Sequence, residues 1–199
     1  LLKQREEIAR HRGEDLVKRY CRRFEAFLSA SKYIRRITEY MHRFWIPQQI
    51  NDNPEGVDVK ELNMLVLCRW NELVLQRIEL LLPVLLDLIN QSRQGEDVDW
   101  QVLAGVIRSF VTIGSAINAE QPVQLYTHTF ELKFLKRTQQ FYRKASTKFV
   151  SENAVADYMR KVTKWLEEEE EGADTHLHLE TKSKLRATCI GVLIDDWKD

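Results

Sequence analysis

Glycine and proline, the residues that most often interrupt regular secondary structure, are scarce in this chain. There are 7 Gly and 4 Pro among 199 residues, so long stretches contain neither of them. The alternating apolar and polar patterns and the Asn-Gly or Asp-Gly turns that are typical of β-hairpins are also missing from the sequence. The sequence therefore predicts an all-α fold of long helices joined by short connections.

Apolar residues recur every three or four positions and outline successive amphipathic helices. We expect a short helix ending near Arg12, a helix over residues 14–28, a break with capping chemistry at 29–31, and a helix that stops at Pro47. Residues 47–56 combine two prolines with Asn, Asp and Gly and predict a loop. The helix before this loop has an apolar stripe that we expect to be buried, formed by Ile34, Ile37, Tyr40, Met41, Phe44 and Trp45.

The rest of the chain predicts further helices in sequence, which suggests a stack or bundle. Pro83 fits the first turn of one of them, where its ring and its missing N–H are tolerated. Asp97 or Asp99 can cap the helix that follows. The expected stretches are a single helix over residues 57–82, a helix from Pro83 to Arg93, one that Gly114 ends, one over residues 125–150, one capped by Asn153, and one over residues 181–197.

Charge is balanced, with 30 Lys and Arg against 30 Asp and Glu. This balance excludes a protein that binds DNA or an acidic membrane through a large global positive charge. The longest apolar run, residues 80–86, is far shorter than the ~20 residues of a membrane span, so we expect no transmembrane helix and no membrane partner.

Basic residues are nevertheless concentrated near the start of the chain. This basic cluster leaves open an alternative function as a helical module that binds nucleic acid or an acidic partner. The aromatic residues between the basic ones fall on the inward stripe, and we assign them to packing; they are Tyr20, Phe24, Phe27 and Tyr33. The cluster consists of Arg10, Arg12, Lys18, Arg19, Arg22, Arg23, Lys32, Arg35, Arg36 and Arg43.

Motifs for catalysis are missing: the chain has no Gly-rich phosphate loop, no dinucleotide-binding motif and no nucleophile elbow. His176 and His178 are the best metal candidates, but a His-x-His pair does not share one helical face, and a helix-to-helix corner is the preferred interpretation. The glutamates at residues 167–171 predict a solvated helix face. We therefore expect neither enzymatic activity nor a cofactor nor a metal.

Three cysteines, far apart in the sequence, fit reduced thiols in the cytoplasm and nucleus better than a disulfide framework. The chain begins without Met and without a signal peptide. We expect it to be a piece of a longer protein.

The second half of the chain carries several motifs in a fixed order. The longest is Leu125-Tyr126-x-x-x-Phe130-Glu131-x-x-Phe134-Leu135-x-x-Thr138-x-x-Phe141-Tyr142, followed by Val155-x-x-Tyr158-Met159-x-x-Val162 and His176-Leu177-His178-x-x-Thr181. Upstream lie Gly95-Glu96, Gly105-Val106-Ile107-x-Ser109-Phe110-Val111, and two tryptophans, Trp45 and Trp70. Together these motifs resemble the N-terminal repeats of the cullin family over essentially the whole chain.

The resemblance implies a scaffold. Cullins are non-catalytic scaffolds of multisubunit RING E3 ubiquitin ligases, in which the N-terminal repeats hold a Skp-like or BTB-type adaptor with its substrate receptor. A C-terminal domain, which this chain does not contain, holds the RING subunit. The expected fold is a stack of helical repeats forming an elongated rod, with the later helices of the first repeat at residues 1–82 and the second repeat at 83–199.

The resemblance also implies a binding surface. In this family the adaptor binds two helices of the first repeat, and only the second of them, at residues 57–74, has a counterpart here. By position, the adaptor-binding candidates are Lys60, Asn63, Met64 and Leu67, of which the first two stand where the family has tyrosines. Leu67 lies off the inward stripe, which includes Leu65. The alternative is that Met64 and Leu67 only cover neighbouring helices.

Overall fold

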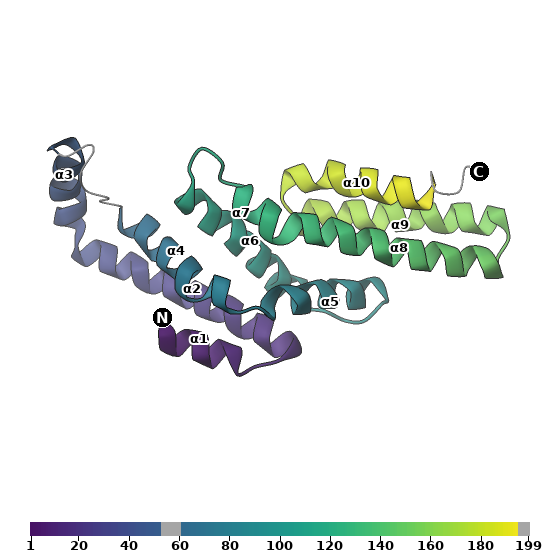
Figure 1. The fold of residues 1–199 in the computed structure, drawn as a ribbon, viewed down its shortest axis with the longest axis horizontal. Coiled ribbons are helices and arrows are strands. Elements are labelled where there is room, and N and C mark those ends of the chain that lie inside the picture. The colour runs from purple at the N-terminus through teal and green to yellow at the C-terminus, as the bar shows by residue number, and fades with distance from the viewer. Residues whose placement is uncertain (53–60, 195–199) are drawn as a thin grey trace. The chain divides into compact units, whose positions relative to one another are not determined.

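The computed structural model describes residues 1–52 and 61–194, and every regular element within them is a helix (Figure 1). This confirms the all-α prediction. Among the elements, η1 and η3 are π-helical turns and η2 is a 3-10 turn. In chain order the elements are α1 (Leu2–Ala9), α2 (Gly13–Ile37), η1 (Met41–Trp45), α3 (Ile46–Asp52), α4 (Leu62–Leu73), η2 (Leu75–Arg77), α5 (Leu81–Arg93), α6 (Trp100–Ile117), α7 (Gln124–Tyr126), η3 (Thr127–Glu131), α8 (Leu132–Glu152), α9 (Val155–His176) and α10 (Leu179–Leu193).

The described residues form two compact units. The first comprises those of Leu1–Val84 and Ser109–Gln124, and the second those of Leu85–Arg108 and Leu125–Asp199. Helices α5 and α6 each supply residues to both units. The division into repeats at residues 82 and 83 stays a prediction, because compactness does not mark where a sequence repeat ends.

The core of the first unit is built around Trp70 of α4. Its side chain is fully buried, and its indole N–H donates to the hydroxyl of Tyr20 at 3.3 Å. That hydroxyl is also 3.1 Å from the hydroxyl of Ser109, and burial raises the pKa of Tyr20 to about 12. The rings of Phe24 and Phe27 pack on Trp70 with centroid distances of 5.4 and 4.8 Å. The polar ends of two large aromatic side chains are therefore satisfied inside an apolar core.

The core of the second unit lies between α8, α9 and α10, which run side by side (Figure 1). Phe134 and Tyr142 of α8, Val162 of α9 and Leu185 of α10 are each 2% exposed. Tyr158 of α9 ties the far end of the bundle to α10 by donating its hydroxyl to the carbonyl oxygen of Leu193 at 2.8 Å. These side chains come from the apolar stripes that the sequence predicts for these helices.

Helix α2 runs without a break through residues 29–31, where the sequence predicted a cap. Ser31 is buried, and its hydroxyl donates to the carbonyl oxygen of Leu28 at 2.7 Å, within the same helix. Serine can form such a bond inside a helix as well as cap one, so its presence alone does not mark a helix end. Helix α2 is consequently 25 residues long.

The apolar stripe predicted to be buried at the end of α2 and in η1 is exposed, and that prediction was wrong. Helical spacing shows that residues share a face, but it does not supply a neighbour to cover that face. The exposed fractions are 49% for Ile34, 84% for Ile37, 75% for Tyr40, 46% for Met41, 55% for Phe44 and 47% for Trp45.

Pro47 does not end the helical chain, although α3 continues directly from η1 and proline has no N–H to donate to the turn before it. The wider π-helical turn η1 directly precedes it and accommodates the ring against the turn before. The loop predicted at residues 47–56 is therefore helical as far as Asp52, and residues 53–60 lie outside the described part of the chain.

The single helix predicted over residues 57–82 is interrupted. Its residues 57–60 lie outside the described part, and the backbone leaves the helical conformation at Val74, with φ −121° and ψ −65°. Val74 and the next residue, Leu75, are both buried, at 0% and 9% exposed. Neighbouring residues on a straight helix point about 100° apart, so the break lets both side chains reach the core.

The predicted helix starts at Pro83 and Asp99 were right. The predicted C-terminus at Gly114 and the predicted helix start at Asn153 were wrong. Pro83 lies in the first turn of α5, and Asp99 accepts two backbone N–H groups at the start of α6, at 3.1 and 3.3 Å. Helix α6 continues past Gly114, because the burial of its apolar face outweighs the roughly 1 kcal/mol that glycine costs in a helix. Asn153 caps the end of α8 instead of the start of α9, since its Nδ2 donates to a carbonyl in the last turn at 3.0 Å.

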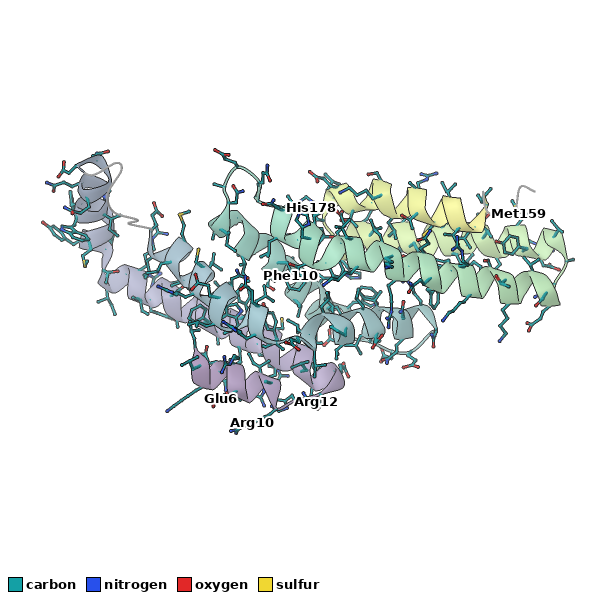
Figure 2. All side chains as sticks on the ribbon, viewed as in Figure 1. Glu6, Arg10, Arg12, Phe110, Met159 and His178 are labelled. Carbon is teal, nitrogen blue, oxygen red and sulfur yellow. The ribbon has the colours of Figure 1, made fainter. Side chains whose placement is uncertain are left out.

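Helix α6 is the one described helix that is long and apolar enough, by length and composition, to cross a membrane, with a mean hydropathy of 1.4 over 18 residues. Its apolar sequence is not an unbroken run, because Arg108 and several small polar residues interrupt it. Half of it is buried within the protein, and Phe110 (Figure 2) is 1% exposed. This pattern is typical of a core helix.

Candidate functional site

Three of the four predicted adaptor-binding residues lie in the first two turns of α4. Asn63, Met64 and Leu67 are each half-buried. Leu65, which the sequence placed on the inward stripe, is 41% exposed, so that assignment was wrong. Lys60 lies outside the described residues. The start of α4 is therefore a surface and not a core segment, and its role in adaptor binding stays a prediction.

Asn63 and Leu67 line an open groove of about 900 Å³ in the first unit. The groove lies between α2, with η1 at its end, and α4; the two helices are neighbours in this unit (Figure 1). The other lining residues are Leu28, Ser31, Lys32, Arg35, Arg36, Glu39 and Arg43. We call this feature the α2–α4 groove. It brings two predicted adaptor-binding residues together with the last four members of the basic cluster.

Three cations in the first part of the basic cluster, Lys18, Arg19 and Arg23, are paired with carboxylates inside the first unit. Glu7 of α1 accepts hydrogen bonds from Arg23, and Arg19 lies 3.4 Å from the same carboxylate. The bond from Arg23 lowers the pKa of Glu7. Lys18 is 2.7 Å from Glu14, one turn earlier in α2. These cations hold α1 against α2 or brace α2 itself.

The four cations of the basic cluster that line the α2–α4 groove are not paired in this way within the described residues. Lys32, Arg35, Arg36 and Arg43 are exposed, and none of them forms a salt bridge with a carboxylate in the described part of the chain. Glu39 is the one acidic side chain among the described residues that line the groove. The groove is therefore a local region of positive charge on a chain whose net charge is zero.

A buried ion pair that the sequence analysis missed joins α5 to α9 in the second unit. Arg93, whose side chain is 8% exposed, donates from Nε and Nη2 to the two carboxylate oxygens of Glu169 at 2.7 and 2.8 Å. Its other N–H groups reach Asn90 Oδ1 at 3.1 Å and Thr138 Oγ1 at 2.8 Å. The Tyr142 hydroxyl donates to Glu169 at 2.8 Å. Both charges are thus bonded on several sides, as a buried pair requires.

Aromatic rings surround this pair. Burial, together with the Glu169 carboxylate, raises the pKa of Tyr142, and burial raises the pKa of Cys189 to about 12. Both groups stay protonated at neutral pH, so the cluster stabilises the helices and offers no nucleophile. The Arg93 guanidinium carbon lies 5.4, 5.5 and 5.7 Å from the ring centroids of Phe134, Phe141 and Tyr142.

The prediction that residues 167–171 form a solvated face was therefore wrong for Glu169, which is 12% exposed. Five consecutive residues cover more than one helical turn, so at least one of them must face the core side of α9. Glu169 lies four residues from both Trp165 and Ala173, and Ala173 is buried. That spacing is the signal that could have identified it from the sequence.

A second buried polar cluster joins η3 to α10. Glu131, 1% exposed, accepts hydrogen bonds from Thr181 at 2.7 Å and from Lys184 Nζ at 2.8 Å. Burial would raise the pKa of Glu131, but the bonds from Lys184 and Thr181 outweigh it and lower the pKa. The Tyr126 hydroxyl is 2.7 Å from that of Thr181. The Tyr, Glu and Thr of the long motif and the corner motif thus fasten helices together.

His176 and His178 lie at the turn between α9 and α10, as the corner interpretation predicts. His176 stacks on Trp100 with a centroid distance of 4.6 Å, and burial, with a smaller contribution from Arg108, lowers its pKa. His178 (Figure 2) precedes α10 and accepts the backbone N–H of Glu180 at 3.4 Å. Within the described residues, no group of three or more His, Cys, Asp or Glu could hold a metal ion.

Comparison with known proteins agrees with the motifs. The family model of the cullin alpha solenoid domain matches residues 1–199. The chain is 37% identical to Cullin-1 of Dictyostelium discoideum over 187 residues, which cover 92% of this chain and 24% of that protein. It is 29% identical to Cullin-1 of Caenorhabditis elegans (94% and 25% covered) and 24% identical to Cell division control protein 53 of Saccharomyces cerevisiae (92% and 23% covered). It spans about a quarter of the length of these relatives. The chain belongs to the cullin family.

Proposed function

We propose that this chain is part of a non-catalytic scaffold subunit of a cullin-RING E3 ubiquitin ligase. The observation that carries the proposal is the match of the cullin alpha solenoid model to the whole chain. Buried clusters such as Arg93–Glu169 support it, because they hold helices from distant parts of the sequence in fixed positions. The RING subunit would bind a part of the parent protein outside this chain.

Within this scaffold, we assign the start of α4 to the surface that supports binding of a Skp-like or BTB-type adaptor. Asn63 and Leu67 are half-buried side chains at a groove, so a partner can cover them without the core being opened. Partly exposed apolar side chains beside polar ones are typical of the anchor positions of an interface. Met64 shares the same helix turns, and Lys60 precedes them in the sequence.

Binding of purified Skp-like and BTB-type adaptors to the chain tests this assignment. We expect Asn63→Lys and Leu67→Asp each to weaken binding at least tenfold, because each places a charge at an apolar or close-packed contact. The matched control is Leu132→Asp in the second unit, where the leucine is 53% exposed, and binding should not change. Melting temperatures close to that of the unchanged chain must accompany the loss. If the melt collapses, Leu67 is a core residue; if both variants bind normally, the assignment is wrong.

The scaffold role itself is tested on the parent protein. We expect it to co-purify with a RING subunit and an adaptor from cytoplasmic and nuclear extracts. This location is part of the proposal, and it is in keeping with the described residues, in which Cys21, Cys68 and Cys189 form no disulfide. Recovery of the parent protein with neither a RING subunit nor an adaptor would refute the scaffold role.

A further inference from the structure

We propose that the α2–α4 groove docks an acidic amphipathic helix of the adaptor. The inference rests on the proposed function, because Asn63 and Leu67 belong to this groove. It adds the chemistry of the partner segment: apolar side chains on one face and carboxylates along its edge.

The shape of the groove fits a helix. Its α2 side runs from Leu28 to Arg36, about 12 Å at the helical rise of 1.5 Å per residue, which matches about two turns of a partner helix. Leu28 on α2 and Leu67 on α4 line it from its two sides, and both are half-buried. Two aliphatic side chains facing each other across a groove provide the contact that the apolar face of an amphipathic helix needs.

The positive charge of the groove indicates which residues the edge of the docked helix should carry. Four cations, Lys32, Arg35, Arg36 and Arg43, and one carboxylate, Glu39, line it, so its net charge is +3. Lys18, Arg19 and Arg23, earlier in α2, are already paired with carboxylates, whereas none of these four forms a salt bridge within the described part of the chain. A partner with Asp or Glu along its edge would therefore gain ion pairs without breaking any that exist.

The same observations favour a protein helix over a nucleic acid. Single-stranded nucleic acids bind through aromatic side chains on which the bases stack, and no aromatic residue is among the described residues lining the groove. A phosphate backbone would contact the cations but leave Leu28 and Leu67 uncovered. An acidic amphipathic helix uses both kinds of side chain.

The test compares two charge reversals of equal size. Arg35→Glu/Arg36→Glu changes the groove, and Arg10→Glu/Arg22→Glu changes exposed arginines outside it; Arg10 extends away from α1 (Figure 2). The dissociation constants of a purified Skp-like adaptor and of a purified BTB-type adaptor are measured with the 199-residue chain. We expect the groove variant to bind at least about tenfold more weakly and the control to bind normally. Arg35→Gln/Arg36→Gln serves as a milder variant if the reversal does not fold.

A zero-length carbodiimide crosslink identifies the partner segment. It joins Lys32 to any carboxylate in contact with it, and mass spectrometry of the complex should find Lys32 linked to Asp or Glu of a helical adaptor segment. Parallel titrations use a labelled single-stranded RNA and a labelled DNA duplex. Salt-sensitive nucleic-acid binding that the groove reversal abolishes would overturn the inference in favour of a nucleic-acid site.

The outcomes separate the inference from the proposed function. If Leu67→Asp weakens adaptor binding but Arg35→Glu/Arg36→Glu does not, the adaptor surface is right and the acidic helix is wrong. If no adaptor binds the unchanged chain, the assignment of the adaptor surface to α4 fails and the inference fails with it, while the scaffold role is decided by the co-purification with the parent protein. If groove and control reversals weaken binding equally, the effect is long-range charge and the groove is not the docking site.

Discussion

Replacing Arg93 by Met should destabilise the second unit by ~3–5 kcal/mol, because it leaves a buried carboxylate without its counter-ion. Methionine occupies much of the aliphatic volume of arginine, but Glu169, 12% exposed, keeps only the hydroxyl of Tyr142 as a partner in the cluster. For a unit of about 100 residues each 1 kcal/mol corresponds to roughly 4–8 °C. The melting temperature of the second unit should therefore fall by about 12–40 °C.

The assay is urea unfolding followed by circular dichroism, with hydrogen exchange of α8 and α9 to assign the transition to the second unit. Arg160→Met is the matched control, because Arg160 also pairs with a carboxylate, Asp157, at 2.7 Å but is 78% exposed. That change should cost no more than about 1 kcal/mol. The double variant Arg93→Met/Glu169→Met should recover most of the loss, since both charges are then removed together.

Two results would refute this reasoning. If Arg93→Met costs no more than Arg160→Met, then Glu169 is not isolated from solvent and the pair does not lock the helices. If the double variant is as unstable as the single one, the loss comes from packing against the surrounding rings and not from the unpaired charge.

Three further predictions concern other elements. Because the folded pKa of Glu131 is lowered, its stabilisation is present above the unfolded value near 4.3 and is lost as the pH falls through the folded pKa; the change in melting temperature on acidification should be smaller in Glu131→Gln. Gly13 has φ +56° with open space around it, so Gly13→Ala should cost about 1–2 kcal/mol from backbone strain alone, measured by urea unfolding. Ile37→Ser, at 84% exposed, should change the free energy of unfolding by less than about 0.5 kcal/mol, whereas Ile8→Ser, at 0% exposed, should cost about 3 kcal/mol or more; similar losses would show that Ile37 is covered in solution.

Part of the candidate site could be predicted from the sequence. Asn63 was assigned to the binding surface by its position in the family pattern, and Leu67 also because it lies off the inward stripe. The structure places both at the groove. The groove itself could not be predicted, because Leu28 and Leu67 are far apart in the chain and meet only when α2 and α4 pack. The distinction between paired and unpaired cations in the basic cluster likewise depends on where Glu7 of α1 lies.

The sequence by itself determined the helical class, the packing role of Tyr20, Phe24 and Trp70, and the cullin motifs. These depend on residue spacing within one helix, which is a local property of the chain. Only the tertiary structure decided which faces are covered. It exposes the stripe that ends at Trp45, and it exposes 66% of Tyr33, whose assignment to packing was wrong. It also joins Arg93 to Glu169, which are 76 residues apart. The physical reason is that periodicity defines a face, whereas burial and ion pairing require a second element that packs against that face.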